Sequence, residues 1–237
     1  MIHFPSKQPQ VQTTIFTKMS QLALDEGAFN LSQGFPGFDC SEELQELLKF
    51  YSKGHNQYAP MAGVPVLRQS IAAKTSNFYG IDIDANTEVT VVSGATEALF
   101  AAIHCCVSPG DEVIMFDPSY DAYDPIVRLA GGVPVHISLK ADDNFRINWE
   151  ELAAKITYKT RAIMVNTPHN PTGSVWAMED LDAFAEVVKG TNILIVSDEV
   201  YEHIVFDGAQ HASVLLHPEL RKRSFVCGSF GKTYHIT

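Results

Sequence analysis

From residue 88 onward, short apolar runs rich in β-branched residues alternate with segments in which apolar positions recur at helical spacing. The apolar runs are continuous rather than interrupted by polar residues, which is typical of parallel strands buried on both faces of a sheet. The pattern predicts strands at 89–93, 113–116, 133–139, 162–166, 193–197 and 225–229. It predicts helices between them at 96–107, 120–130, 149–155 and 178–189. This order predicts a doubly wound α/β fold.

The first part of the chain lacks this alternation. Residues 1–37 are predicted to be irregular and to end in a turn-rich segment. Two helices are predicted after it, one between Ser41 and Gly54 and one from Pro65 to Gly80.

Composition and charge weigh against several classes of protein. Hydrophobic residues make up 46% of the chain, enough for a full core, and the net charge of −11 comes without any Lys/Arg-rich run. Nucleic acids and anionic membrane surfaces are therefore poor partners. The apolar runs are too short to span a bilayer, and the polar N-terminus lacks the apolar block of a signal peptide. The four cysteines form no CxxC pair and the nine histidines no HExxH motif, so we expect free thiols in the cytoplasm and no metal site.

Polar and aromatic residues follow the predicted strands. In doubly wound folds, ligands bind in the crevice beyond the carboxyl ends of the strands, so these segments define the candidate site. They are Ser93-Gly94-Ala95-Thr96, Asp117-Pro118-Ser119-Tyr120, Asn166-Thr167-Pro168, Asp198-Glu199-Val200-Tyr201 and Ser229-Phe230-Gly231-Lys232.

The tripeptide Gly94-Ala95-Thr96 lies between a predicted strand and a predicted helix. Small residues let the backbone approach a phosphate, which the free N–H groups and the helix dipole attract. A tight turn with an ordinary helix cap explains the same residues, and the tripeptide taken alone favours that simpler interpretation.

The pentapeptide Ser229-Phe230-Gly231-Lys232-Thr233 fits three interpretations. Its end resembles a P-loop, but Val226 stands where that motif needs glycine. Ser229 and Lys232 match the S-x-x-K motif of serine acyl-enzymes, but the SDN and KTG elements of that class do not occur. The third interpretation is a lysine that forms an imine with a cofactor aldehyde. On the pentapeptide alone, an exposed structural lysine is the simplest explanation.

Asp198 favours the imine interpretation. It follows the apolar run 193–196, and a buried acid needs a cationic partner or a proton. A pyridinium nitrogen is such a partner, because the carboxylate keeps it protonated and the ring then withdraws electrons from the substrate. Tyr201 and Asn170 could donate to the phenolic oxygen of such a ring, and Tyr120 could stack on its face. Each residue alone has an ordinary structural explanation, but their order along alternating strands makes a chance combination improbable.

These ordered motifs resemble those of fold-type I, class I/II aminotransferases. They are Asn-Pro-x-Gly at 170–173, Asp-x-x-Tyr at 198–201 and Ser-x-x-Lys at 229–232. Nearly the whole chain takes part, and the most similar branch contains kynurenine/glutamine transaminases and bacterial methionine aminotransferases. The resemblance implies a three-layer α/β/α fold with a mostly parallel sheet and pyridoxal 5′-phosphate as cofactor. It also implies transfer of an amino group between an amino acid and a 2-oxo acid.

The resemblance assigns a role to each matching residue. Lys232 is the catalytic lysine, which holds the cofactor and carries the proton. The other cofactor-binding residues are Gly94, Ala95, Thr96 and Ser229 at the phosphate, Tyr120 on the ring face, Asn170 and Tyr201 at the ring oxygen, and Asp198 at the ring nitrogen. Gly34 and Asn166 are expected near the substrate carboxylate, and Tyr58 at the phosphate of a partner subunit in a homodimer.

Members of this family continue well beyond the catalytic lysine, whereas this sequence ends at Thr237. We therefore expect residues 1–37 to be part of a small domain whose C-terminal portion is missing, and 38–237 to form an incomplete cofactor-binding large domain. The expected consequences are an unfilled slot inside the sheet, exposed strand edges and poor solubility. No useful amino transfer by this chain alone is expected, because substrate positioning is lost.

The leading hypothesis is an aminotransferase acting on methionine, aromatic or glutamine-like donors, and two alternatives stay open. A C–S β-lyase uses the same cofactor and the same lysine, and product analysis separates it from an aminotransferase. A truncated, inactive remnant that at most binds the cofactor is the other alternative.

Overall fold

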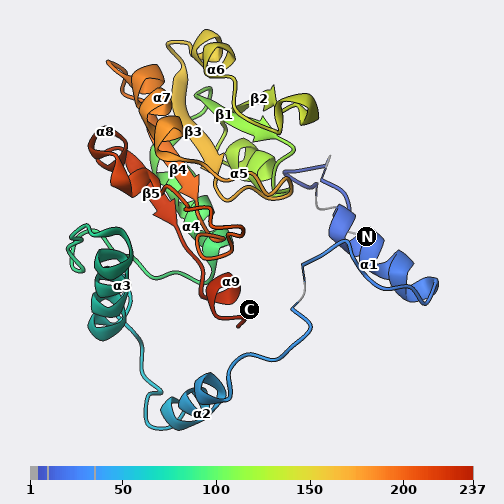
Figure 1. Cartoon of the computed structure of the whole chain (residues 1–237), viewed down its shortest axis with the longest axis vertical. Coiled ribbons are helices and arrows are strands. Elements are labelled where there is room, and N and C mark those ends of the chain that lie inside the picture. The colour runs from blue at the N-terminus through green and yellow to red at the C-terminus, as the bar shows by residue number, and fades with distance from the viewer. Residues whose placement is uncertain (1–4, 10, 35, 237) are drawn as a thin grey trace.

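A five-stranded parallel sheet forms the centre of the molecule (Figure 1). The computed structural model describes residues 5–9, 11–34 and 36–236. The sheet has the order β2-β1-β3-β4-β5. Its strands are β1 (Glu112–Asp117), β2 (Val133–Ser138), β3 (Thr160–Asn166), β4 (Leu194–Asp198) and β5 (Ser224–Cys227).

Two hydrophobic clusters cover the two faces of this sheet. One contains Ile163 and Val165 of β3 and packs under α6 (Trp149–Lys155), α7 (Met178–Val188) and α8 (Pro218–Arg221). The other contains Ala162 and Met164 of the same strand and packs under α4 (Ala95–Cys106) and α5 (Tyr123–Leu129). Successive side chains of a strand point to opposite faces, so this division confirms the predicted three-layer α/β/α fold.

The expectation of strands buried on both faces holds for the inner strands only. The side chains of β1, β3 and β4 are almost all buried. β2 lies at one edge of the sheet, where only Ile137 is fully buried and Val133 is 48% exposed. An edge strand has a neighbour on one side only, so fewer helices cover it.

Residues 89–93 do not form the predicted strand. The Val91 N–H instead donates to the Ala62 carbonyl, and Gly63 lies so near that a Cβ there would sit 2.7 Å from the Val91 side chain. A β-branched run becomes a strand only beside another strand, and none pairs with it in the part of the chain that the structure describes.

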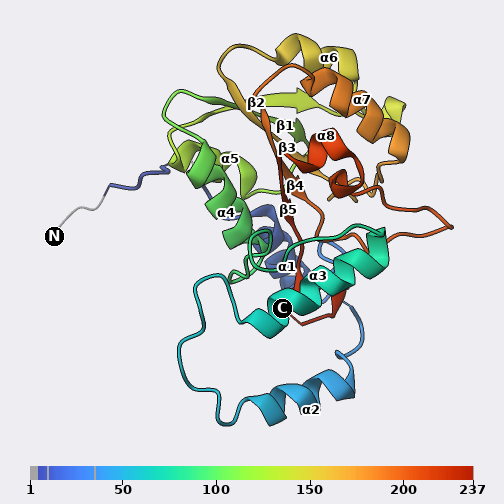
Figure 2. The ribbon, with the colours of Figure 1, turned by 90° about the vertical axis from the view of Figure 1, so that its left-hand side faces the viewer.

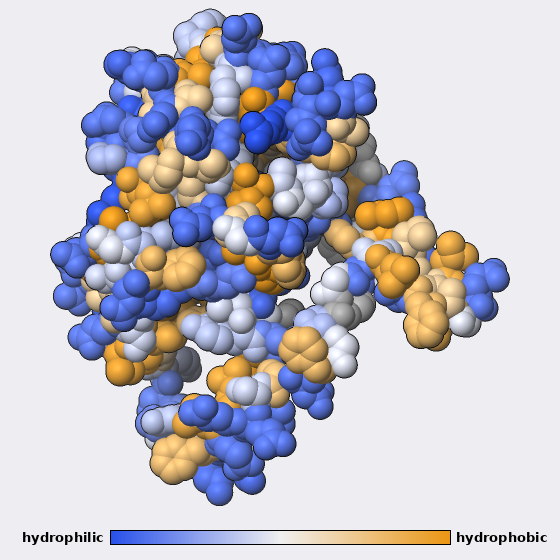
Figure 3. Space-filling view, in the orientation of Figure 1, coloured by the Kyte–Doolittle hydropathy of each residue, from blue (hydrophilic) through white to orange (hydrophobic). Residues whose placement is uncertain are grey.

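The prediction that residues 1–37 are irregular is also wrong. Helix α1 (Ile15–Asp25) occupies the middle of this segment, and the Thr14 hydroxyl caps it by accepting from the Thr17 N–H at 3.2 Å. Positions 1–4, 10 and 35 lie outside the described residues. No side chain of α1 is buried, and its apolar residues gather on an outer surface (Figure 3).

The helices α2 (Glu42–Tyr51) and α3 (Pro65–Tyr79) agree with the predicted positions to within a few residues. The short helix α9 (Phe230–Thr233) and the 3-10 turns η1 (Ala141–Asp143) and η2 (Val214–Leu216) were not predicted. Helix α5 begins at Tyr123 rather than at 120, because residues 118–122 first turn away from the end of β1. Helix α2 lies at the end of a long loop, away from the sheet (Figure 2). Among the described residues, no helix has the length and apolar character to cross a membrane.

Candidate functional site

The carboxyl ends of three neighbouring strands lie at the same level. Asn166 at the end of β3 is in register with Asp198 at the end of β4, which is in register with Cys227 at the end of β5. In parallel strands the side chains that follow these positions meet at one rim of the sheet. Helix α4 packs against β4 and β5, so its N-terminus belongs to the same region.

Asp198 is the buried acid of this rim, with only 5% of its surface exposed. The Tyr123 hydroxyl donates to its Oδ2 at 2.6 Å, and the Val200 N–H donates to its Oδ1 at 3.3 Å. Burial raises the pKa of Asp198, while these two hydrogen bonds and the positive charge of Lys232 act in the opposite direction. A carboxylate in this environment is stabilised by a further cationic group.

Asn166 connects the segments that follow β3 and β4. Its Nδ2 donates to the Asp198 carbonyl at 2.8 Å, and its Oδ1 accepts from the Asn170 N–H at 2.7 Å. The Thr167 N–H donates to the same Asp198 carbonyl at 3.1 Å. Asn166 therefore fixes the positions of Asn170 and Asp198, and its predicted contact with a substrate carboxylate stays a prediction.

Lys232 lies beyond the end of β5, in α9. Its Nζ is 5.4 Å from the centroid of the Tyr201 ring, which places a cation beside the turn that begins at Asp198. The Ser229 hydroxyl caps α9 by accepting from the Lys232 N–H at 3.4 Å. Lys232 is exposed, so its amine is accessible to a ligand.

The N-terminus of α4 carries the predicted phosphate segment. Gly94 is the residue before the helix, with φ +86°, a conformation that glycine adopts without strain. No side chain caps this end, and a Cβ at Gly94 would meet open space. The N–H groups of Ala95 and Thr96 therefore lack the side-chain partner that an ordinary N-cap would provide. The first turn also contains Glu97, whose carboxylate accepts from the Ser93 N–H.

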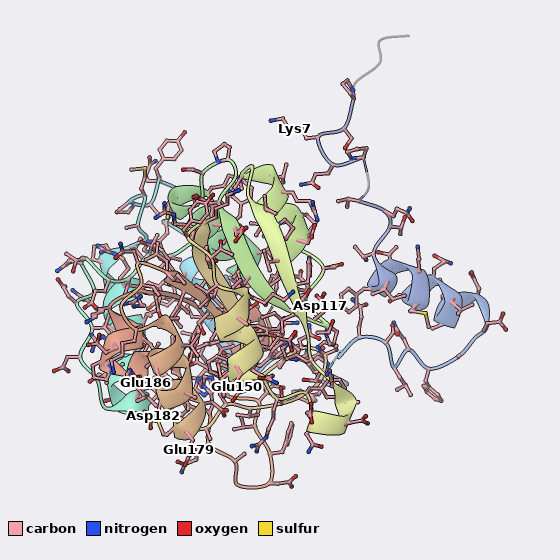
Figure 4. The ribbon with its side chains drawn as sticks, turned by 90° about the horizontal axis from the view of Figure 1, so that it is seen from above. Lys7, Asp117, Glu150, Glu179, Asp182 and Glu186 are labelled. Carbon is pink, nitrogen blue, oxygen red and sulfur yellow. The ribbon has the colours of Figure 1, made fainter. Side chains whose placement is uncertain are left out.

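Tyr120 packs against Tyr123, the residue whose hydroxyl binds Asp198. The two tyrosine rings meet edge to face, with centroids 5.7 Å apart. Tyr120 also lines an open groove together with Gln33 and residues of α1, so the neighbouring Gly34 lies on the same side of the molecule. Asp117, at the end of β1, faces this side in the view from above, whereas the acidic residues of α6 and α7 lie on another side (Figure 4). These acidic residues are Glu150, Glu179, Asp182 and Glu186.

The structure thus brings most of the predicted residues together, whereas Gly34 and Tyr58, from the exposed N-terminal part, lie apart from them. Those that meet at the rim are Tyr120, Asn166, Asn170, Asp198, Tyr201, Ser229 and Lys232. Tyr58, in the loop between α2 and α3, has a fully exposed side chain and packs against none of them. Among the residues that the structure describes, no three His, Cys, Asp or Glu side chains form a group that could hold a metal ion.

Tyr123 was missed by the sequence reasoning. It belongs to the buried face of α5 with Ile126 and Val127, and its hydroxyl reaches Asp198 across the core. A tyrosine on an apolar stripe was itself a signal, because a buried phenol needs a hydrogen-bond partner. The sequence could not name that partner, which lies 75 positions away.

Comparison with known proteins decides the family. A family model described as "Aminotransferase class I and II" matches residues 26–237. The chain belongs to the class I and II aminotransferases.

Two named relatives are similar to this aminotransferase chain. It is 52% identical over 233 residues to the methionine aminotransferase of Escherichia coli (strain K12), covering 98% of the chain and 60% of that relative. It is 37% identical to the kynurenine–oxoglutarate transaminase of Dictyostelium discoideum, covering 98% of the chain and 58% of that relative. The chain thus spans about 60% of the length of the curated relatives it matches.

Solved structures confirm the fold of the aminotransferase chain. An Escherichia coli structure with a methionine aminotransferase function superposes with a TM-score of 0.94 at 50% identity, covering 99% of this chain and 61% of that one. The aspartate aminotransferase of Thermus thermophilus superposes with a TM-score of 0.89 at 30% identity, covering 99% of this chain and 62% of that one.

The rim of this aminotransferase chain fits the cofactor of its family. Class I and II aminotransferases depend on pyridoxal phosphate. That cofactor needs an acid for its ring nitrogen, an amine for its aldehyde and N–H donors for its phosphate. Asp198, Lys232 and the uncapped N-terminus of α4 provide groups of these three kinds.

Proposed function

We propose that this chain is part of an aminotransferase that moves an amino group between an amino acid and a 2-oxo acid, with pyridoxal phosphate held at the rim. The observation that carries the proposal is the buried Asp198 beside Lys232. Burial raises the pKa of this acid, and the charge of Lys232 opposes that rise. Two groups of opposite charge at adjacent strand ends are the arrangement that this chemistry requires.

When bound, pyridoxal phosphate supplies an aldehyde that condenses with amines and a ring that accepts electrons from the substrate Cα. Lys232 holds the cofactor through its Nζ. When not bound to the cofactor, the Nζ would serve as the base that moves a proton at the substrate Cα. An ordinary lysine has a pKa of about 10.4 and stays protonated at neutral pH, so covalent attachment keeps Lys232 ready to act as a base.

The other residues of the rim bind and orient the cofactor. Asp198 holds a proton on the ring nitrogen, and Tyr123 fixes the carboxylate that does so. Tyr201 and Asn170 donate to the ring oxygen, while Tyr120 covers one ring face. These residues would orient the bound cofactor relative to Lys232.

The phosphate lies at the N-terminus of α4 in this proposal. Its oxygens accept from the N–H groups that follow Gly94, those of Ala95 and Thr96, and from Ser229. Tyr58 reaches the phosphate of a second subunit, which agrees with its full exposure in this chain. The assembly we propose is therefore a homodimer with shared sites.

Substrate and location complete the proposal. The donors are methionine, aromatic or glutamine-like amino acids; the names of the two relatives, which mention methionine and kynurenine, support the first two. Gly34 and Asn166 lie near the substrate carboxylate. Residues 1–37 are part of a small domain and 38–237 form the large domain. The site of action is the cytoplasm, and the four free thiols support a reducing compartment.

The absorption spectrum of the purified chain with pyridoxal phosphate tests this proposal. We expect a visible band from the lysine-bound cofactor that Lys232→Ala abolishes, while Lys222→Ala, a change at another exposed lysine, keeps it. A band that survives Lys232→Ala contradicts the assignment. Product analysis separates the two reactions: with methionine and a 2-oxo acid acceptor, amino transfer yields a new amino acid, whereas a C–S β-lyase acting on a cysteine conjugate releases a thiol, ammonia and pyruvate.

A further inference from the structure

Glu199 lies between two predicted cofactor contacts and points away from them. It separates Asp198 from Tyr201 in the turn after β4, yet only 1% of its surface is exposed. Its Oε1 accepts from the Ser197 hydroxyl at 2.8 Å and from the Val214 N–H at 3.1 Å. Its Oε2 is buried and has no hydrogen-bond partner among the described residues. One half of this carboxyl group is anchored, and the other half needs an explanation.

A histidine nitrogen close to that oxygen also lacks a partner within the described ranges. The Nε2 of His211 is buried, has no hydrogen-bond partner in the described part of the chain, and lies 3.9 Å from Glu199 Oε2. This separation exceeds a hydrogen bond by about 1 Å, a shift that two side chains can make without moving the backbone. A buried polar atom without a partner destabilises the folded state, so a contact between these two atoms is favoured.

The protonation of His211 follows from the groups on its other side. The Tyr79 hydroxyl donates to Glu202 Oε2 at 2.7 Å, because that carboxylate, bound by Lys74 at 2.5 Å, can only accept. Tyr79 has a single proton to donate, so its oxygen accepts from His211 Nδ1–H at 3.2 Å. The contact with Tyr79 therefore favours a proton on Nδ1 and leaves a lone pair on Nε2 toward Glu199, while the Thr167 carbonyl, which also faces this ring, favours a ring proton.

We propose that Glu199 carries a proton on Oε2, donates it to His211 Nε2, and thereby positions the turn that holds Asp198 and Tyr201. Glu199 is a positioning residue in this account, since it points away from the cofactor. The role rests on the function proposed above, whereas the hydrogen-bond assignment does not.

Hydrogen bonds connect the turn after β4 to α3. Lys74 and Tyr79 come from α3, and both reach Glu202 at the end of the turn. Helix α3 buries only Ala72 and Thr75, so polar contacts are a large part of what holds it. The titratable groups that face the junction are Lys74 and Tyr79 of α3, Glu202 and His203 of the turn, and Cys227 of β5.

The pKa shifts of Glu199 and His211 agree with a proton on Glu199. Burial raises the pKa of Glu199 to about 7, and burial lowers the pKa of His211 to about 4. The proton therefore resides on Glu199 up to about pH 7 while His211 stays neutral. Because the folded pKa of Glu199 lies above its unfolded value, its contribution to stability is complete below that unfolded value and is lost as pH rises through about 7.

Nitrogen NMR of the histidine rings in the cofactor-free chain tests the assignment. His211 is identified by its loss in His211→Gln. At about pH 6, where an unperturbed histidine is mostly charged, we expect His211 to be neutral with its proton on Nδ1. A proton on Nε2, or a doubly protonated ring, overturns the proposal. Tyr79→Phe removes the acceptor at Nδ1 and should weaken the preference for this form, and an unchanged preference contradicts the network.

Cofactor binding tests the positioning role. Glu199→Gln keeps a donor toward His211 and an acceptor for Val214, whereas Glu199→Leu keeps the volume and removes both. We expect pyridoxal phosphate to bind about tenfold more weakly to the Leu variant and within about twofold of the parent to the Gln variant. Equal losses in both variants show that an ionised carboxylate is needed and overturn the proposal, as does unchanged binding in both. No cofactor band in the parent refutes the proposed function instead, and the ring-proton measurement still decides the assignment.

Discussion

The sheet region and the N-terminal helices both contain patterned apolar residues, but these residues are buried only in the sheet region. In the sheet and its flanking helices, apolar side chains such as Phe184 are fully buried between layers. In α1 and α2 no side chain is buried, and Leu22 and Phe50 are 49% and 71% exposed. Local pattern is enough to specify a helix, but burial requires a second surface that faces it.

This difference also divides the candidate site. The residues proposed to hold the ring and the aldehyde come from strand ends of the well-packed body. Gly34 and Tyr58 come from the exposed N-terminal part and lie apart from the cluster around Asp198. We infer that the body determines the cofactor chemistry, while the N-terminal part contributes to substrate binding and to contacts between subunits.

The largest expected effect separates the two regions directly. Phe184→Ala removes a fully buried ring that packs against Trp149 and Trp176, and should lower the free energy of unfolding by about 3–5 kcal/mol. Phe50→Ala makes the same change on α2, where the ring is 71% exposed, and should cost less than about 0.5 kcal/mol. Urea denaturation followed by circular dichroism measures both, and equal losses contradict the comparison.

The next effect tests one close contact, between the loop before α3 and the segment before α4. Gly63→Ala places a Cβ 2.7 Å from Val91 and forces a residue with a side chain to φ +96°, which should cost about 2–3 kcal/mol. Gly54→Ala is the matched control, because its φ is +79° but its Cβ would meet open space. Its cost should be about 1 kcal/mol. The same thermal or urea unfolding experiment compares them, and a smaller loss for Gly63→Ala disproves the close packing.

A smaller effect tests the hydrogen bond that holds the buried acid. Tyr123→Phe leaves Asp198 without its 2.6 Å donor, so the free energy of unfolding at neutral pH should fall by about 1–3 kcal/mol. Pyridoxal phosphate should also bind less tightly, because the carboxylate loses its orientation. Tyr58→Phe removes an exposed hydroxyl and should change stability by less than about 0.5 kcal/mol. A stable Tyr123→Phe chain with unchanged cofactor affinity refutes the role of Tyr123.

For exposed ion pairs we expect no difference in stability between the N-terminal helices and the body around the sheet. Lys49 pairs with Glu46 on α2 and Lys189 pairs with Glu186 at the end of α7, each with both side chains more than two thirds exposed. Replacing either lysine by alanine should change the free energy of unfolding by less than about 0.5 kcal/mol, since solvent screens such pairs. A loss above about 1 kcal/mol at either position shows that the pair has partners beyond the contact described.

The sequence predicted the fold where periodicity and burial agree. Helix α6 has the predicted ends, and β1, β3 and β4 lie within two residues of their predicted positions, because continuous apolar runs such as 193–197 fit only a doubly covered strand. The run 89–93 is also rich in β-branched residues, but no strand lies beside it among the described residues, and pairing is not a local property. Helix α1 was not predicted, and none of its side chains is buried in the structure.

The site was predictable in part for the same reason. Asp198, Asn170 and Lys232 follow strands, and parallel topology gathers strand ends without any knowledge of side-chain contacts. The contacts of Tyr123 with Asp198 and of Glu199 with its neighbours depend on how helices pack across the sheet. The interior position of Glu199 could not be predicted, because a glutamate after a strand is exposed in most folds.

The central claim is that Lys232 is the residue that holds pyridoxal phosphate in this chain. Incubation with the cofactor, reduction with borohydride and peptide mass spectrometry locate the amine that becomes permanently modified. The account predicts that the modification falls on Lys232, at a cofactor concentration too low to label the exposed Lys189 and Lys222. Modification spread evenly over exposed lysines, with no preference for Lys232, would contradict it.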